Sequence, residues 1–123
     1  MDAQVAAKAH HLLGDHPFAL TVLARVVSTV ERFGPADVRV SKSQIALRRR
    51  HGFAYLWRPR QYLGKGAEIV LSIALGRQDG SPRFKEVVHP SPRHWLHHLE
   101  IDDPKAVDAE VAGWLREAFD RAG

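Results

Sequence analysis

The spacing of apolar residues changes twice along this chain of 123 residues, and this limits the fold more than any other feature. Segments 17–33 and 107–119 carry apolar side chains at helical spacing, which gives each segment one buried stripe. Between them, positions 38–75 alternate with a period of two, the spacing that places successive side chains on opposite faces of a strand. We therefore expect an α+β domain: an antiparallel sheet of about four to five strands with the N- and C-terminal helices packed on one face.

The strands differ in how apolar they are. Segment 69–75 is apolar on both faces and predicts a central strand. Segments 45–48 and 53–57 flank a polar stretch and predict a hairpin around 50–52. Segment 84–88 fits either a short strand or a turn of helix, and 95–101 fits the last strand.

Capping residues predict where the helices begin. Asp15, His16 and Pro17 are typical of a helix start, because a polar side chain can accept from the free amides and proline suits the first turn. For the last helix, Asp102 or Asp103 is the expected cap, with Pro104 in the first turn. We expect residues 1–14 to be an N-terminal helical arm and residues 15–123 to form one domain.

Composition excludes several classes of protein. The chain has no cysteine, which excludes disulfides, thiolate zinc sites and cysteine nucleophiles. No apolar run approaches the ~20 residues that span a bilayer, and the first residues lack the pattern of a signal peptide. We therefore expect a cytoplasmic protein without membrane contact.

Positive charge is concentrated in the middle of the chain. Residues 39–93 contain twelve basic and three acidic residues, whereas the flanks together are net acidic. This asymmetry predicts a basic sheet face or hairpin that engages nucleic acid or another anionic partner. The candidate residues are Lys42, Arg48, Arg49, Arg50, Arg58 and Arg60. The arginines at 48–50 can equally be a solvated hairpin tip that keeps a sheet edge soluble.

Aromatic residues alternate along the same hairpin. Phe53, Tyr55 and Trp57 lie beside basic residues, a combination that stacks single-stranded nucleic acid on an open sheet. The same residues also pack well against helices, and we expect them to be core or half-buried.

Histidines gather near the end of the predicted sheet. In a strand, His97 shares a face with Trp95 and Leu99, whereas His94, His98 and Glu100 share the other face. That second set is linear along the strand and does not surround an ion, so we expect no metal site. His98 beside Glu100 is a candidate general base, but no nucleophile can be placed near it, and no catalytic residue is assigned.

A nucleotide cofactor is not expected either. Gly64-Lys65-Gly66 precedes a strand, whereas phosphate-binding glycine loops follow a strand and open a helix.

Four short motifs, in order, resemble a known family. They are VRVSKSQI at 38–45, RHGFAYLW at 50–57, WLHH at 95–98, and Asp108 followed by GWLREA at 113–118. Together they resemble the bacterial domain-of-unknown-function family 5655. The resemblance implies a small α+β domain and supplies no activity, although members have been loosely described as predicted transport proteins. The matching positions Lys42, Phe53, Trp57, Trp95, His98 and Trp114 are candidates for a structural or a binding role.

Three functional hypotheses follow from these patterns. The first is a non-enzymatic module that binds an anionic partner through the basic residues given above. The second is a small-ligand-binding protein or enzyme with a cleft at Phe53, Trp57, Trp95, His97 and His98. The third is a protein-interaction domain that forms a homo-oligomer through the open sheet face or a helix.

Overall fold

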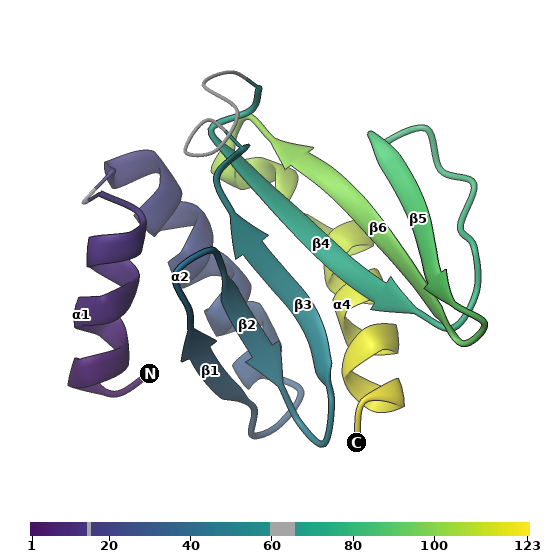
Figure 1. The fold of residues 1–123 in the computed structure, drawn as a ribbon, viewed down its shortest axis with the longest axis horizontal. Helices are drawn as coiled ribbons and strands as arrows, with labels where there is room; N and C mark the ends of the chain where they lie inside the picture. Colours follow the sequence, from purple (N-terminus) through teal and green to yellow (C-terminus); the bar gives the residue numbers. More distant parts are fainter. Residues whose placement is uncertain (15, 60–65) are drawn as a thin grey trace.

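The computed structural model describes residues 1–14, 16–59 and 66–123, and within them six strands form one antiparallel sheet. The sheet order is β1-β2-β3-β4-β6-β5, so β6 lies between β4 and β5 (Figure 1). The strands are β1 (Asp37–Val40), β2 (Ile45–Arg48), β3 (Gly52–Trp57), β4 (Ile69–Leu75), β5 (Glu86–Ser91) and β6 (His94–Ile101). The helices are α1 (Ala3–Leu12), α2 (Pro17–Glu31), the short 3-10 helix η1 (Pro104–Ala106) and α4 (Ala109–Arg121).

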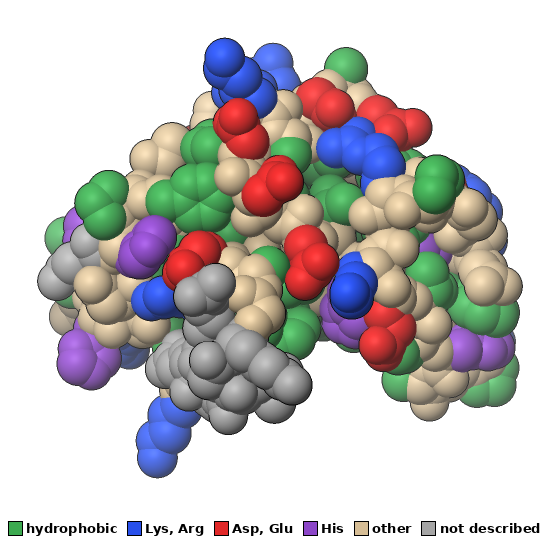
Figure 2. All heavy atoms as spheres, turned by 90° about the horizontal axis from the view of Figure 1, so that it is seen from above, with side chains coloured by type: hydrophobic (Ala, Val, Ile, Leu, Met, Phe, Trp, Pro, Cys, Tyr) green, Lys and Arg blue, Asp and Glu red, His purple; other side chains and the backbone are tan. Residues whose placement is uncertain are grey.

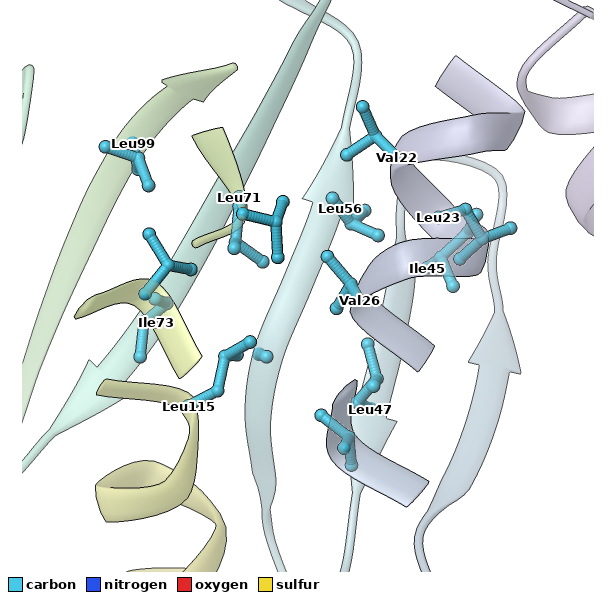
Figure 3. Packing of buried hydrophobic residues seen from close by; sticks show 14 of the residues in the cluster. Val22, Leu23, Val26, Ile45, Leu47, Leu56, Leu71, Ile73, Leu99 and Leu115 are labelled. Atoms are coloured by element: carbon cyan, nitrogen blue, oxygen red, sulfur yellow. The ribbon is translucent and has the colours of Figure 1, made fainter. Parts of the chain in front are cut away.

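The helices cover one face of the sheet and leave the other face open. In Figure 1, α2 and α4 lie behind the sheet, and the open face is turned toward the viewer. Figure 3 shows Val26 of α2 and Leu115 of α4 packed over Leu56 and Leu71 of the central strands. All four side chains are buried, and burial of such residues stabilises the fold by about 1.5–3 kcal/mol each. The α+β prediction, with helices packed on one sheet face, is confirmed.

The sheet has more strands than the four to five predicted, and segment 86–91 accounts for part of the difference. This segment forms the edge strand β5, and Val87 pairs with His97 of β6. Phe84, just before it, turns into the core and packs on the His97 ring with centroids 4.7 Å apart. These contacts favour a strand over a turn of helix, because the free edge of β6 supplies hydrogen-bond partners.

The C-terminal helix begins later than predicted. Asp103 caps the short η1 helix, where its side chain accepts from the Lys105 amide at 2.8 Å. The cap of α4 is Asp108, whose carboxylate accepts from the Val111 amide at 3.1 Å. Val107 separates the two helices, and its carbonyl accepts from Arg25 Nε of α2 at 2.9 Å. This hydrogen bond ties the segment between η1 and α4 to α2.

Helix α2 begins where its predicted capping residues indicate. His16 Nδ1 accepts from the Ala19 amide at 3.3 Å at the start of α2, whereas Asp15 lies outside the described residues. The predicted arm, α1, lies beside β1 (Figure 1), and Ala9 and Leu13 are fully buried in the same core as the sheet. In the described part of the chain, no helix is both long and apolar enough to cross a membrane.

Candidate functional site

One row of paired residues crosses the entire sheet on its open face. In sheet order, the row consists of Arg39, Ala46, Tyr55, Ser72, His98 and Glu86. The residues on either side of this row, such as Leu56 and Leu71, face the helices, and side chains alternate along each strand. The row therefore has a basic end, an acidic end and a polar, aromatic middle.

The middle of the open face is hollowed because the central strand carries small residues there. Ser72 and Ala74 of β4 form the floor, between Tyr55 and Trp57 of β3 and the longer side chains of β6. Since β3 and β6 both pair with β4, their backbones stand roughly 10 Å apart. The resulting cleft has a volume of about 520 Å³. Its lining is Gln44, Gly52, Tyr55, Trp57, Ser72, Ala74, Pro90, His94, Leu96 and His98.

A chain of hydrogen bonds joins three lining residues across three strands. The Trp57 indole Nε1 donates to Ser72 Oγ at 2.9 Å, and Ser72 Oγ lies 2.6 Å from His98 Nδ1. The rings of Trp57 and His98 meet edge to face, with centroids 5.9 Å apart. Each member is therefore held by another before any ligand is present.

This hydrogen-bond chain favours one tautomer of His98. An indole N–H can only donate, so Ser72 Oγ is the acceptor toward Trp57. The described residues give the Ser72 hydroxyl proton no other acceptor than His98 Nδ1. The tautomer that pairs this proton within the protein has Nδ1 as the acceptor and the proton of neutral His98 on Nε2.

The surroundings of His98 favour its neutral form. Burial is the largest cause and lowers the pKa of His98, while Glu86 opposes this and the neighbouring His97 adds to it. Ser72 itself is only 1% exposed, and its hydroxyl is used within the protein. The pair is therefore arranged as a hydrogen-bonding wall of the cleft and not as an accessible nucleophile with its base.

Gly52 makes room for the ring of Tyr55 at one end of the cleft. A Cβ atom at position 52 would collide with the Tyr55 hydroxyl and lie 3.1 Å from its Cζ. Any side chain there must displace Tyr55 from its place in the lining.

The sequence model of the family described as Domain of unknown function (DUF5655) matches residues 8–122 of this chain. The chain belongs to the DUF5655 family. The resemblance carried by the four short motifs is thereby confirmed. Comparisons with curated proteins and with solved structures find no match.

Five of the six predicted anion-binding residues are described, and the DUF5655 domain does not bring these five together. Arg58 forms an ion pair with Glu68 at 3.1 Å and donates to the Leu13 carbonyl. At the other end of β3, Arg49 donates to the Phe119 carbonyl at 2.8 Å and stacks on the Phe119 ring. These two arginines stabilise the contacts of α1 and α4 with the rest of the domain.

The remaining predicted basic residues are spread over separate places. Arg48 is half-buried at the end of β2, Arg50 is exposed in the hairpin turn, and Lys42 is exposed between β1 and β2. Arg60 lies outside the described residues. In the view of Figure 2, basic and acidic side chains lie among one another. Arg83 also forms an ion pair with Asp108 at 3.1 Å. A single basic face is thus not visible in that view.

The five residues of the predicted cleft separate onto two sides of the sheet. Trp57 and His98 lie together on the open face, as described above. His97 is fully buried on the helix side, where Nε2 accepts from the Asp79 amide and Nδ1 donates to the Trp95 carbonyl, each at 2.9 Å. Trp95 shares the side of His97 and stacks on His89.

Phe53 is on the helix side because of an irregularity in the hairpin. The pairing of β2 with β3 shifts between Leu47 and Arg48, and Phe53 is the extra residue of β3. Its ring packs on Phe119 of α4 with centroids 5.8 Å apart. The predicted stripe of Phe53, Tyr55 and Trp57 is therefore divided between core and cleft.

Ser72 and Ala74, which form the floor, are among the lining residues that sequence reasoning missed as part of a site; the others are Gln44, Gly52, Pro90 and Leu96. The available signal was a pair of small residues on the second face of a strongly apolar strand. Metal binding has no support in the geometry: among the described residues, no three His, Asp or Glu side chains converge as ligands.

Proposed function

We propose that this domain binds a small organic ligand in the cleft on the open face of its sheet. The observation that carries the proposal is the hydrogen-bonded set Trp57, Ser72 and His98, which lines a cleft of about 520 Å³ across three strands. A preformed, largely apolar hollow with a few fixed polar groups is typical of small-molecule sites. These side chains are carried by strands of the sheet, which supports the same conclusion, because binding then costs little conformational entropy of the protein.

A thermal-shift screen with small aromatic fragments tests this proposal. Ala74→Val fills the floor of the cleft, because Ala74 is 5% exposed and lies among the lining residues. Ala46→Val is the matched control, since Ala46 lies on the same open face but outside the lining. Fragments should raise the Tm of the wild type and of Ala46→Val, and Ala74→Val should lose that rise. An equal rise in the Tm of Ala74→Val and Ala46→Val would mean that the fragments bind outside this cleft.

Anion binding remains a second candidate, favoured by a hollow between α1 and the β1–β2 turn. Lys8 and His11 of α1 and Lys42 of the turn line this hollow, which has a volume of about 650 Å³. Basic groups from two elements that converge on one concavity attract phosphate-bearing ligands. Retention of a short single-stranded oligonucleotide should fall steeply with salt and should weaken in Lys8→Ala. Lys105→Ala, an exposed lysine in η1, is the control, and an equal loss there would contradict the assignment.

A further inference from the structure

We infer that the ligand of the open-face cleft is a flat, uncharged heteroaromatic molecule whose edge presents a hydrogen-bond acceptor to His98 Nε2. This inference rests on the proposed function and specifies the class of ligand. It follows from the shape of the cleft, from the charges in its lining and from the direction of its hydrogen bonds.

The shape of the cleft favours a flat ring. Its floor consists of the small side chains Ser72 and Ala74, and Tyr55 and Trp57 place two aromatic rings along one wall. Leu96 lies on the β6 side of the cleft. Aromatic and aliphatic walls that stand two strand spacings apart leave a narrow trough, which a planar ring fills with the most contact.

The charges favour a ligand that is neutral where it enters the cleft. Within the described residues, the lining contains no Lys, Arg, Asp or Glu side chain. A buried ionic group would have no counter-charge there and would lose its hydration. The titratable groups near His98 on the open face are Glu86 on β5, Glu100 and His94 on its own strand, and Tyr55 on β3.

Within the set Trp57, Ser72 and His98, the hydrogen bonds leave one donor available. The Trp57 indole N–H already donates to Ser72 Oγ, and in this tautomer the Ser72 hydroxyl donates to His98 Nδ1. No described residue accepts from His98 Nε2, which carries the proton in this tautomer. A ring nitrogen or carbonyl oxygen on the ligand would accept a hydrogen bond from His98 Nε2, whereas a donor on the ligand would face another donor.

Three probes of similar size separate these features. Quinoline presents a ring nitrogen as an acceptor, naphthalene has the same shape without an acceptor, and indole presents a donor. Titrations at pH 7.5, followed by NMR of the Trp57 indole signal, should give quinoline the lowest Kd. The advantage over naphthalene should be about three- to tenfold, the usual worth of one net hydrogen bond. Indole should bind no better than naphthalene.

Variants assign the difference to His98. In His98→Phe the ring remains but the donor is lost, so quinoline and naphthalene should bind equally. His89→Phe, which changes a histidine stacked on Trp95 on the other side of the sheet, should retain the quinoline preference. The imidazole ¹⁵N shifts of the wild type should show a protonated Nε2 and an unprotonated Nδ1.

The outcomes distinguish the ligand class from the cleft itself. Equal Kd values for quinoline and naphthalene in the wild type, or a protonated Nδ1, would overturn the inference while leaving the cleft as a binding site. No response of Trp57 or His98 to any of the three probes at saturation would overturn both the inference and the proposed function. A quinoline preference that disappears only in His98→Phe would support both.

Discussion

The carboxylate of Asp79 accepts a hydrogen bond from the Trp114 indole at 3.0 Å and thereby joins the turn after β4 to α4. The same carboxylate accepts from the Ser81 amide at 2.9 Å and from Arg77 at 3.2 Å. The backbone amide of Asp79 donates to the buried His97. This one residue therefore links the helix layer to the strand whose other face bears His98.

Asp79→Asn should destabilise the domain by about 1–2 kcal/mol at pH 7, because a charge-assisted acceptor is replaced by a weaker one. The hydrogen bond from Ser81 is the main cause that lowers the pKa of Asp79, and Trp114 and Arg77 act in the same direction. The stabilisation is therefore complete above the unfolded pKa, near 3.8, and is lost as the pH falls through the lower folded value. Urea unfolding at pH 7 and pH 3 should show the cost shrinking at pH 3. A cost that is equal at both pH values would contradict this role.

Asp108→Ala should destabilise the domain by about 1 kcal/mol, because it removes the cap of α4 and a partner of Arg83. Asp102→Ala is the matched control, since Asp102 is exposed and caps neither helix. Chemical denaturation of the two variants measures the difference. A larger loss of stability in Asp102→Ala than in Asp108→Ala would contradict the assignment of Asp108 as the cap and favour the cap predicted from the sequence.

Gly113→Ala should stabilise the domain by about 0.5–1 kcal/mol. Gly113 is exposed inside α4, and a Cβ there would meet no atom within 4 Å, so alanine gains helix propensity without a clash. Gly52→Ala should have the opposite effect, because its Cβ would collide with Tyr55. The Tm values of the two variants should lie on opposite sides of the wild-type value. A stable Gly52→Ala with unchanged fragment binding would contradict the place assigned to Tyr55.

His97→Leu should cost roughly 2–4 kcal/mol, because the Asp79 amide and the Trp95 carbonyl would each lose a buried partner. His94→Leu, an exposed residue of the same strand, should change stability by less than about 0.5 kcal/mol. Denaturation midpoints of the two variants test this contrast. Similar midpoints would show that the hydrogen bonds of His97 contribute little.

The imidazole of His98 should titrate below its ordinary value of 6.5, because burial lowers its pKa. The unfolded chain then binds a proton before the folded domain does, so the free energy of unfolding should fall as the pH drops from about 6.5 to the folded pKa. NMR titration of the His98 ring protons gives the folded value, and His98→Phe should lose this part of the pH dependence. A pKa above 6.5 would mean that Glu86 outweighs burial.

Local periodicity explains why the layers of this fold could be predicted from the sequence. The stripe of α2 and the alternation along β4 each follow from residues a few positions apart. The same alternation correctly separated His97 from His98. The predicted cap of α4, Asp102 or Asp103, was wrong, because Asp103 caps the separate short helix η1 and Asp108 caps α4. The Val107 carbonyl between the two helices accepts from Arg25, a partner distant in sequence that local patterns do not reveal.

The cleft depends on pairings that local patterns do not specify. Tyr55, Ser72 and His98 become neighbours only through the register of β3, β4 and β6. In the sheet, β6 lies between β4 and β5, although β5 precedes it in the chain. The basic residues show the converse. Arg49 and Arg58 are near in sequence to other arginines, yet their partners Phe119 and Leu13 come from distant helices. Charge density along a sequence therefore does not specify which of these arginines are engaged with distant parts of the chain.

The three indole N–H signals provide the most direct test of the open-face cleft. Trp57 lies in the cleft, Trp95 lies on the other side of the sheet, and the Trp114 indole is hydrogen-bonded to Asp79. Titration of ¹⁵N-labelled protein with quinoline and with naphthalene should move the Trp57 signal and leave the Trp95 and Trp114 signals in place. A stationary Trp57 signal at saturation, or movement of Trp95 or Trp114 instead, would contradict a binding site on this face.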